Sequence, residues 1–415
     1  MNDVKPAEDH IVANRLSMVQ RDELPEDQRR FHDAVKAIRR SPISGPFITL
    51  LNSSPDLAAR VAHLGCYFHA RGQVDESILP MRVRTFVALL GARTLDGVYE
   101  WSAWVNWALE AGVPPATVDA IREGQPLLDL TAEDALVRDF CAQLATGSHR
   151  VSDPTFLAVL DRFGVQGAVE LAATLGYFAM IAFPLNAFEM EMTAEQIAKR
   201  KPFKPLRIAA HPGPVAACGP AATTREAGTP GASPRVPRIA KHGDMAAANQ
   251  HYFDRVVRTR GRVAGPFAVL LHSPDVAERV AAVGDYLLYH AVLPPAAKTF
   301  AWLLVASEFD CDYEWAYAEC AARKAGIPDT VIDAARRRES FAASGDDRAL
   351  IADFCHQLLR GNHHVADTTY RSVVAQLGVP ATVQLAATVG YFAMQACVLN
   401  AFEVRPEGDP SGLIL

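Results

Sequence analysis

The sequence predicts an all-α protein in which two tandem copies of one helical domain are joined by a flexible linker. Three observations support this prediction. Apolar residues recur at helical spacing, alternating β-branched runs between hairpin turns are absent, and the chain contains an internal repeat. Residues 151–189 align without a gap with residues 365–403, and about 22 of the 39 positions are identical. Chance does not produce such a match, so we expect both copies to share one fold.

Composition divides the chain of 415 residues into three parts. We place the first domain at 26–203, the flexible linker at 204–243 and the second domain at 244–405. The linker is rich in Pro, Gly, Ala, Thr and Ser and has no apolar periodicity, which is typical of a flexible connection. Each copy is long enough to bury a core of its own.

The repeat also covers two motifs in the earlier part of each copy. Gly45-Pro46-Phe47 recurs as Gly265-Pro266-Phe267, and Tyr99-Glu100-Trp101 recurs as Tyr313-Glu314-Trp315. The copies differ by small insertions, the largest of which lengthens the first copy at Arg71 to Ser77. We expect this added loop to enter the site region, so the two sites need not be equal.

Local signals set the helix boundaries in the later part of each copy. Thr131 to Asp134 is a good N-terminal capping sequence, and Ser152-Asp153-Pro154 opens a further helix with Pro at an early position. Gly164 and Gly378 are predicted helix ends. The apolar, Ala-rich stretch at 165–188 is typical of a buried central helix.

Charge and cysteine content exclude several classes of function. The formal net charge is -6 and no basic block stands out, so we expect neither nucleic acid nor a membrane surface as a partner. No signal peptide or membrane span is predicted. The seven cysteines include no Cys-x-x-Cys, which argues against disulfides and zinc knuckles. A cytoplasmic protein without cofactor or metal is therefore expected.

Three segments of the second copy resemble the carboxymuconolactone decarboxylase and alkylhydroperoxidase-D-like family, in the order in which the family has them. They are GPFAVLLHSPDVAERVAAVGDYLLYHAVLPP, CDYEWAYAECAARKAGIP and LAATVGYFAMQACVLNAFEV. The resemblance covers both copies and implies two alkylhydroperoxidase-D-like helical domains. It also implies a homo-oligomer, here a trimer of two-domain chains. The activities it implies are decarboxylation of a small lactone acid and thiol-dependent peroxide reduction.

The peroxidase branch of that family uses two cysteines, a histidine and an upstream glutamate. The matching positions are Gly97, Glu100, Trp104 and Thr85 in the first copy, and Cys311, Glu314, Ala318 and Thr299 in the second. Neither copy has an attacking thiolate, a resolving thiol and a proton relay together, so we expect no robust dithiol peroxidase activity. The resemblance favours a metal-free lyase acting on a small organic acid or lactone by decarboxylation or enolate-type proton transfer. The alternatives are a peroxidase-type oxidoreductase using Cys311, or a non-catalytic binding or assembly protein.

The catalytic candidates are Glu314, Glu100, His290 and Cys311. The two glutamates lie among aromatic residues, which would raise a carboxyl pKa and suit a general acid or base; the alternative is a structural glutamate at a helix end. His290 would trade protons in the pocket or bond to backbone, and Cys311 would be a reactive thiol or a small buried residue.

The substrate-binding candidates are mainly aromatic: Tyr313, Trp315, Tyr99, Trp101, Trp104 and His69. They would wall a pocket for a planar acid, or form core and subunit contacts instead. Asn186 and Asn400 end the repeated helix and are expected to be structural. Of the two copies, the second is favoured as the working site, because Trp104 and the added loop are able to fill or reshape the first pocket.

Overall fold

The computed structural model describes residues 15–17, 19–39, 43–69, 76–190, 235–341 and 347–406. Within these ranges every regular element is a helix, which confirms the predicted all-α class. The hydrophobic core is continuous from one half of the chain to the other, because buried residues of both repeats belong to one contact cluster. The division into two domains therefore stays a prediction.

The two halves have a closely similar order of helices. The N-terminal half contains α1 (Glu26–Arg39), α2 (Pro46–Ser53), α3 (Pro55–His69), α4 (Met81–Thr94), α5 (Val98–Glu110), α6 (Pro115–Glu123), α7 (Ala132–Ala145) and α8 (Asp153–Ala187). The C-terminal half contains α10 (Gln250–Arg260), α11 (Phe267–Leu270), α12 (Pro274–Asp285), the π-helical turn η4 (Tyr286–His290), α13 (Pro295–Glu308), α14 (Asp312–Lys324), α15 (Asp329–Arg336), α16 (Asp347–Leu359) and α17 (Asp367–Ala401). Short 3-10 turns precede α1 and α10: η1 (Arg21–Glu23), η2 (His242–Asp244) and η3 (Ala247–Asn249).

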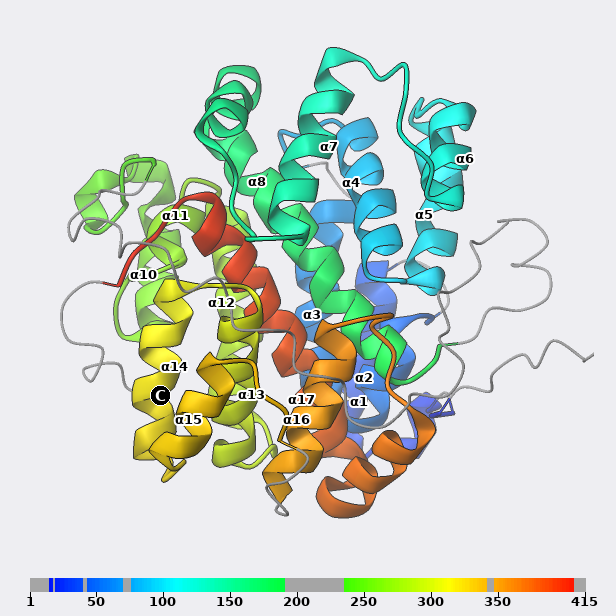
Figure 1. Cartoon of the computed structure of the whole chain (residues 1–415), viewed down its shortest axis with the longest axis vertical. Coiled ribbons are helices and arrows are strands. Elements are labelled where there is room, and N and C mark those ends of the chain that lie inside the picture. The colour runs from blue at the N-terminus through cyan, green and yellow to red at the C-terminus, as the bar shows by residue number, and fades with distance from the viewer. Residues whose placement is uncertain are drawn as a thin grey trace, which may run out of the picture.

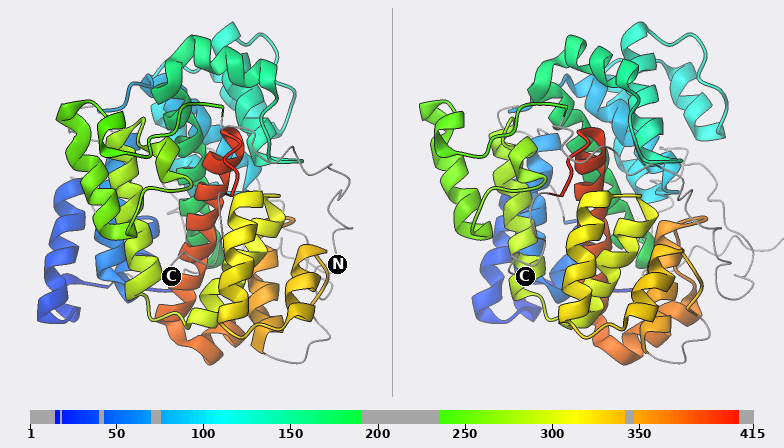
Figure 2. Two further views of the ribbon diagram at one scale, coloured as in Figure 1. Left: turned by 90° about the vertical axis from the view of Figure 1, so that its left-hand side faces the viewer. Right: turned by 60° about the vertical axis from the view of Figure 1, so that its left-hand side comes forward.

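The repeated helices α8 and α17 pack against each other at the centre of the molecule (Figures 1 and 2). Helices α4, α5 and α6 lie on one side of this pair, and α13, α14 and α15 lie on the other (Figure 1). The contact is reciprocal: a Cβ at Gly176 would lie 2.9 Å from the Met394 Cα, and a Cβ at Gly390 would lie 2.7 Å from the Met180 Cα. Two glycines at matching repeat positions thus let two backbones approach closely.

The predicted boundaries of the late helices are largely confirmed. Thr131 caps α7, since its side chain accepts a hydrogen bond from the Asp134 amide, 3.1 Å away. Gly164 and Gly378 interrupt α8 and α17 at φ values of 68° and 78°, where a residue with a Cβ would be strained. Each long helix is therefore a short entry segment followed by a buried central helix.

The expectation that no segment could span a membrane needs correction. α8 and α17 are both long and apolar enough to do so by length and composition. In the most apolar window, however, 100% of α8 and 61% of α17 is buried inside the protein. Since both helices form the centre of the core, their apolar character is explained by packing alone.

The structure describes only the end of the predicted linker, and that end packs on the protein. Residues 204–234 lie outside the described ranges, while Val236 and Ile239 are buried against the C-terminal half. Phe183, an apolar residue of the central helix α8, is only 1% exposed and lies against the His363 ring, so it supplies no surface for assembly. The large apolar side chains that are exposed include Ile78 and Val292, which occupy matching repeat positions.

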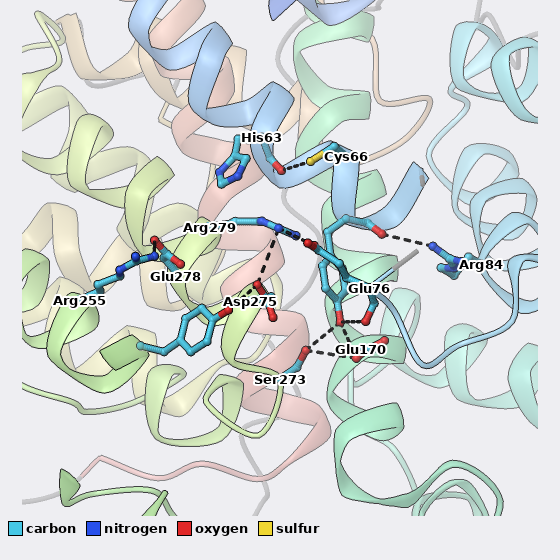
Figure 3. A network of polar contacts seen from close by, with 12 residues as sticks. His63, Cys66, Glu76, Arg84, Glu170, Arg255, Ser273, Asp275, Glu278 and Arg279 are labelled. Carbon is cyan, nitrogen blue, oxygen red and sulfur yellow. Dashed lines mark hydrogen bonds and ion pairs between the residues drawn. The ribbon is translucent and has the colours of Figure 1, made fainter. Parts of the chain in front are cut away.

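A buried polar network joins the two halves beside α3 and α12 (Figure 3). The Glu170 carboxylate on α8 is fully buried and accepts hydrogen bonds from the Tyr67 hydroxyl at 2.6 Å and the Ser273 hydroxyl at 3.2 Å. It also accepts from the Ser77 hydroxyl at 2.5 Å and the Ile78 amide at 3.0 Å. The end of the added loop therefore packs on Glu170.

The matching position on α17 is Gln384, which makes a similar but weaker set of contacts. Its side-chain oxygen accepts from the Leu293 amide at 3.0 Å, and its nitrogen donates to the Ser54 hydroxyl at 2.8 Å. Ser54 and Ser273 are themselves matching repeat positions, so the buried polar residue of each half is hydrogen-bonded to a serine of the other half: Ser273 donates to Glu170, and Ser54 accepts from Gln384. These contacts link the two halves across the shared core.

We expect Glu170→Ala to lower the free energy of unfolding by about 2 kcal/mol, because five hydrogen-bond donors, of which Tyr67 and Ser273 are buried, lose their acceptor. Glu170→Gln is the matched control, since it installs the residue found at position 384 and keeps an acceptor oxygen. Chemical denaturation of the full chain measures both. The interpretation fails if alanine and glutamine cost the same.

Candidate functional site

The two motifs repeated early in each copy meet in space. Gly45 has a φ of 63°, and a Cβ there would lie 2.8 Å from the Tyr99 ring. Gly265 has a φ of 56°, and its Cβ would lie 2.5 Å from the Tyr313 ring. Only glycine allows this backbone conformation and this close approach together. Each half therefore has the same close contact between a glycine and a tyrosine ring, and a pocket lies beside each contact.

The pocket of the N-terminal half, called the first pocket below, has a volume of about 270 Å³. Five helices contribute to its lining. The side chains with acid, base or cationic groups in or at this cavity are Arg39 of α1, His69 of α3, Glu100 and Glu110 of α5, and Tyr177 of α8. Phe47, Tyr99, Trp104 and Trp107 supply aromatic walls. A cavity of this kind suits a small ligand with both apolar and acidic parts.

A histidine and a tyrosine form a hydrogen-bonded pair in the first pocket. His69 Nε2 lies 3.0 Å from the Tyr177 hydroxyl, and both side chains are almost fully buried. The imidazole stacks on the Trp104 ring at 4.6 Å, which fixes its plane. A Cβ at Gly65 would lie 2.5 Å from the Tyr177 hydroxyl, so glycine at this position makes room for the pair. Such a pair is able to pass a proton to or from a bound ligand.

Glu100 lies in the first turn of α5 and is 5% exposed. Its Oε2 accepts a hydrogen bond of 3.1 Å from the Trp104 indole nitrogen, which belongs to the next turn of the same helix. Trp104 therefore contacts both Glu100 and His69 and holds them at one wall of the first pocket. Trp104 was expected to fill or reshape this pocket; its ring does not fill it but forms one wall, and the larger of the two cavities stays open.

The pocket of the C-terminal half, called the second pocket below, has a volume of about 100 Å³. Its lining includes Tyr313, Glu314 and Tyr391, at positions that match Tyr99, Glu100 and Tyr177. Other positions differ: Leu288 replaces His69, and Gln395 replaces Ile181. The second pocket therefore lacks the histidine of the first, and it has an amide where the first has Ile181.

Several predicted site residues do line the pockets. His69, Tyr99, Glu100 and Trp104 line the first, and Tyr313 and Glu314 line the second. Trp101 does not, because it faces the core and is 0% exposed. Trp315 does not line the second pocket. Its indole nitrogen donates a hydrogen bond to Glu319, and the Arg336 guanidinium lies over its ring at 4.8 Å.

The two remaining catalytic candidates lie outside the pocket linings. His290 ends the π-helical turn with a side chain that is 56% exposed, and its ring nitrogen lies 3.5 Å from Asp285. Cys311 precedes α14 and is 1% exposed. Burial raises the pKa of the Cys311 thiol well above its usual value, and the nearby Glu314 adds to this effect, so the thiolate is disfavoured.

The asparagines at the end of the repeated helix are structural, as expected. Asn186 donates to the Leu95 carbonyl at 2.8 Å, and Asn400 donates to the Phe309 carbonyl at 2.7 Å. Each thus satisfies a free carbonyl at the end of a neighbouring helix.

Tyr177 and Arg39 were not predicted from the sequence. One signal was present for Tyr177: the repeated Gly-Tyr-Phe-Ala-Met places a tyrosine at this position in both copies. An aromatic residue inside an apolar helix has the ordinary pattern of a core residue, however, and its hydroxyl partner lies 108 residues away in the chain. No comparable signal exists for Arg39, which closes the pocket only because α1 packs on α3.

No family model, curated protein or solved structure matches this chain. Among the described residues there is no group of three or more His, Cys, Asp or Glu side chains arranged to hold a metal ion. The six cysteines in the described ranges are all free thiols.

Proposed function

We propose that this chain is an enzyme that acts on a small organic acid or lactone by decarboxylation or enolate-type proton transfer, with its reaction centre in the first pocket. The resemblance to the carboxymuconolactone decarboxylase-like family suggested this chemistry. The observation that carries the proposal is the His69–Tyr177 pair, which faces the same cavity as Glu100 and Arg39. The preference for the second copy is withdrawn, because the second pocket is smaller and has leucine in place of the histidine.

Substrate binding in this scheme uses charge and aromatic surface together. The Arg39 guanidinium would pair with a carboxylate of the substrate, as a planar fork of donors suits a carboxylate group. The rings of Tyr99, Trp104 and Trp107 would cover the apolar body of the molecule and exclude water from it. Exclusion of water strengthens the electrostatic interactions at the reacting atoms.

The chemical step needs a proton donor beside a developing oxyanion. When the bond to the departing carboxylate breaks, carbon dioxide leaves and the electron pair moves into an enolate. The Tyr177 hydroxyl would donate a hydrogen bond to the enolate oxygen, and a proton supplied through His69 would go to the carbon. Glu100 lies at the same wall, where it would return a proton to the imidazole through solvent. Atoms and charge balance with one proton taken up for each carbon dioxide released.

The peroxidase alternative receives no support from the position of Cys311. A thiol peroxidase needs an accessible thiolate, whereas Cys311 is buried, has a raised pKa and lies outside the pocket lining. The non-catalytic alternative makes a clear contrary prediction, namely ligand binding without turnover. A trimer of two-domain chains and a cytoplasmic location remain proposals from the resemblance and from the cysteine content.

Unsaturated γ-lactone carboxylic acids are the first substrates to test, with carbon dioxide release and incorporation of solvent deuterium as readouts. We expect turnover by the full chain and a fall of about 100-fold in Glu100→Gln, because the acid group is lost while its shape is kept. Glu314→Gln is the matched control in the second copy and should leave turnover nearly unchanged. The proposal is wrong if the wild-type chain shows neither readout, or if Glu314→Gln alone abolishes the reaction.

A further inference from the structure

The second pocket contains three buried polar atoms that lack a hydrogen-bond partner within the described part of the chain. They are Oε2 of Glu314 on α14, Oε1 of Gln395 on α17 and Nε1 of Trp302 on α13. The Trp302 indole nitrogen and the Glu314 carboxyl are neighbours: the indole lowers the carboxyl pKa, against the larger opposing effect of burial, but the two groups do not meet the geometry of a normal hydrogen bond. Buried polar groups in native proteins are almost always satisfied, so three such atoms around one cavity indicate a polar ligand group.

Neighbouring contacts fix the orientation of these groups. Gln395 Nε2 donates to the Tyr391 hydroxyl at 2.6 Å, which leaves the amide oxygen as a free acceptor. The Tyr391 hydroxyl also accepts from Arg260 Nη2 at 2.7 Å. The amide is therefore held in place by a chain that runs from Arg260 through Tyr391, and its oxygen is preorganised for a donor.

The charged groups of the second pocket favour an anion. Arg260 lies over the Phe267 ring at 5.0 Å, and Arg262 is exposed at the edge. Burial raises the pKa of Glu314 well above its usual value, because the charged form of the carboxyl is poorly solvated there. Arg260 and Arg262 supply the positive charges among the described residues that line the second pocket. Phe267, Leu288 and Phe392 line the space with apolar surface.

The first pocket shows that this arrangement is particular to the C-terminal half. The position of Gln395 is occupied there by Ile181, and the position of Trp302 by Ala88. The matching carboxyl, Glu100, has Trp104 as a hydrogen-bond donor. The first pocket therefore lacks two of these polar groups and has a hydrogen-bond donor for the third. If the three groups served only to pack the repeated fold, both pockets would be expected to have them.

We propose that the second pocket is a separate binding site for a short aliphatic carboxylic acid that carries a hydroxyl group at its far end. The carboxylate pairs with Arg260 and Arg262. The hydroxyl lies at the inner end, where it donates to Gln395 Oε1 and accepts from the Glu314 carboxyl or the Trp302 indole nitrogen. A cavity of about 150 Å³ accommodates benzene. The second pocket, at about 100 Å³, therefore suits a chain of a few carbons rather than a ring.

Isothermal titration calorimetry of the full chain tests this proposal with ω-hydroxycarboxylates of three to six carbons, each compared with the parent acid without the hydroxyl. We expect one chain length to bind best and to lose affinity by about tenfold or more when its hydroxyl is removed, because the buried acceptor is then left unpaired. Equal affinities for a hydroxy acid and its parent would overturn the proposal, as would the absence of binding across the series at millimolar concentration.

Four variants locate the binding. Gln395→Ile, which installs the residue of the first pocket, should weaken the hydroxy acid by about tenfold and leave the parent acid unchanged. Arg262→Ala, at the exposed edge, should weaken both acids alike. Glu314→Gln preserves shape and serves as a second inner variant should Gln395→Ile fold poorly. His69→Leu, in the first pocket, should leave the affinity unchanged; loss of binding in this variant would place the ligand in the wrong pocket and contradict the proposal.

Discussion

His69→Leu is expected to lower turnover of the proposed organic-acid reaction by about 10²–10⁴-fold, with little effect on folding. The substitution removes the imidazole from the first pocket and installs the residue that the second pocket has at the matching position, Leu288. Leucine is therefore the replacement that the matching position of the other half already accommodates. The loss should appear in kcat, because the imidazole acts on the transition state rather than on binding.

Tyr177→Phe should give a loss of similar size, since it removes the hydroxyl that lies 3.0 Å from His69 Nε2. If the two side chains act as one proton relay, the double variant should be scarcely slower than either single variant. Additive losses would instead indicate two independent contributions. The matched control is Tyr391→Phe, which removes the hydroxyl bonded to Arg260 in the second pocket and should leave turnover intact.

The pH dependence of kcat adds a readout that a purely structural histidine would not give. The wild-type profile should contain an ionisation that is lost in both His69→Leu and Tyr177→Phe, while solvent-deuterium incorporation falls in parallel. Unchanged turnover in His69→Leu would remove the imidazole from the mechanism. It would leave Glu100 as the acid or base to be tested.

The sequence predicted the helical class and the glutamates of the two pockets well, because both rest on residues that the two copies share. Glu100 and Glu314 follow a repeated tyrosine, and each lies in the first turn of a helix beside a cavity. Helix periodicity could not decide which tryptophan faces the cavity, since Trp101 and Trp104 are both buried and α5 has protein on more than one side. Only the packing of α3 and α8 around α5 distinguishes them.

The histidines illustrate a second limit. His69 and His290 both precede a Leu-Pro pair in the sequence, but the inserted loop breaks the alignment between them. Counted from Pro55 and Pro274, which both begin a helix, the partner of His69 is Leu288. The π-helical turn then directs His290 to the surface. Because the two copies differ in length here, His290 was predicted to be catalytic although it lies at the surface, while the histidine that lines a pocket is His69.

Gly390→Ala is expected to destabilise the whole chain by about 3 kcal/mol or more. A Cβ at this position would lie 2.6 Å from the Met180 carbonyl oxygen and 2.7 Å from the Met180 Cα. These are backbone atoms in the middle of the buried α8–α17 contact, so no side chain is able to move aside and the helices must separate. Separation opens the core on both sides at once, because both halves pack on this pair.

The matched control is Gly91→Ala in α4. A Cβ there would meet the Phe178 Cβ at 3.5 Å, an ordinary contact distance, and alanine is the better helix former. This variant should therefore be neutral or stabilising by up to about 1 kcal/mol. Chemical denaturation of both variants measures the contrast, and a Gly390→Ala chain as stable as the wild type would mean that the two backbones do not approach closely. Tyr177 and Tyr391 adjoin Gly176 and Gly390 in the sequence, and both line pockets. The same substitution should therefore weaken ligand binding in the second pocket and turnover in the first, even under conditions where the chain stays folded.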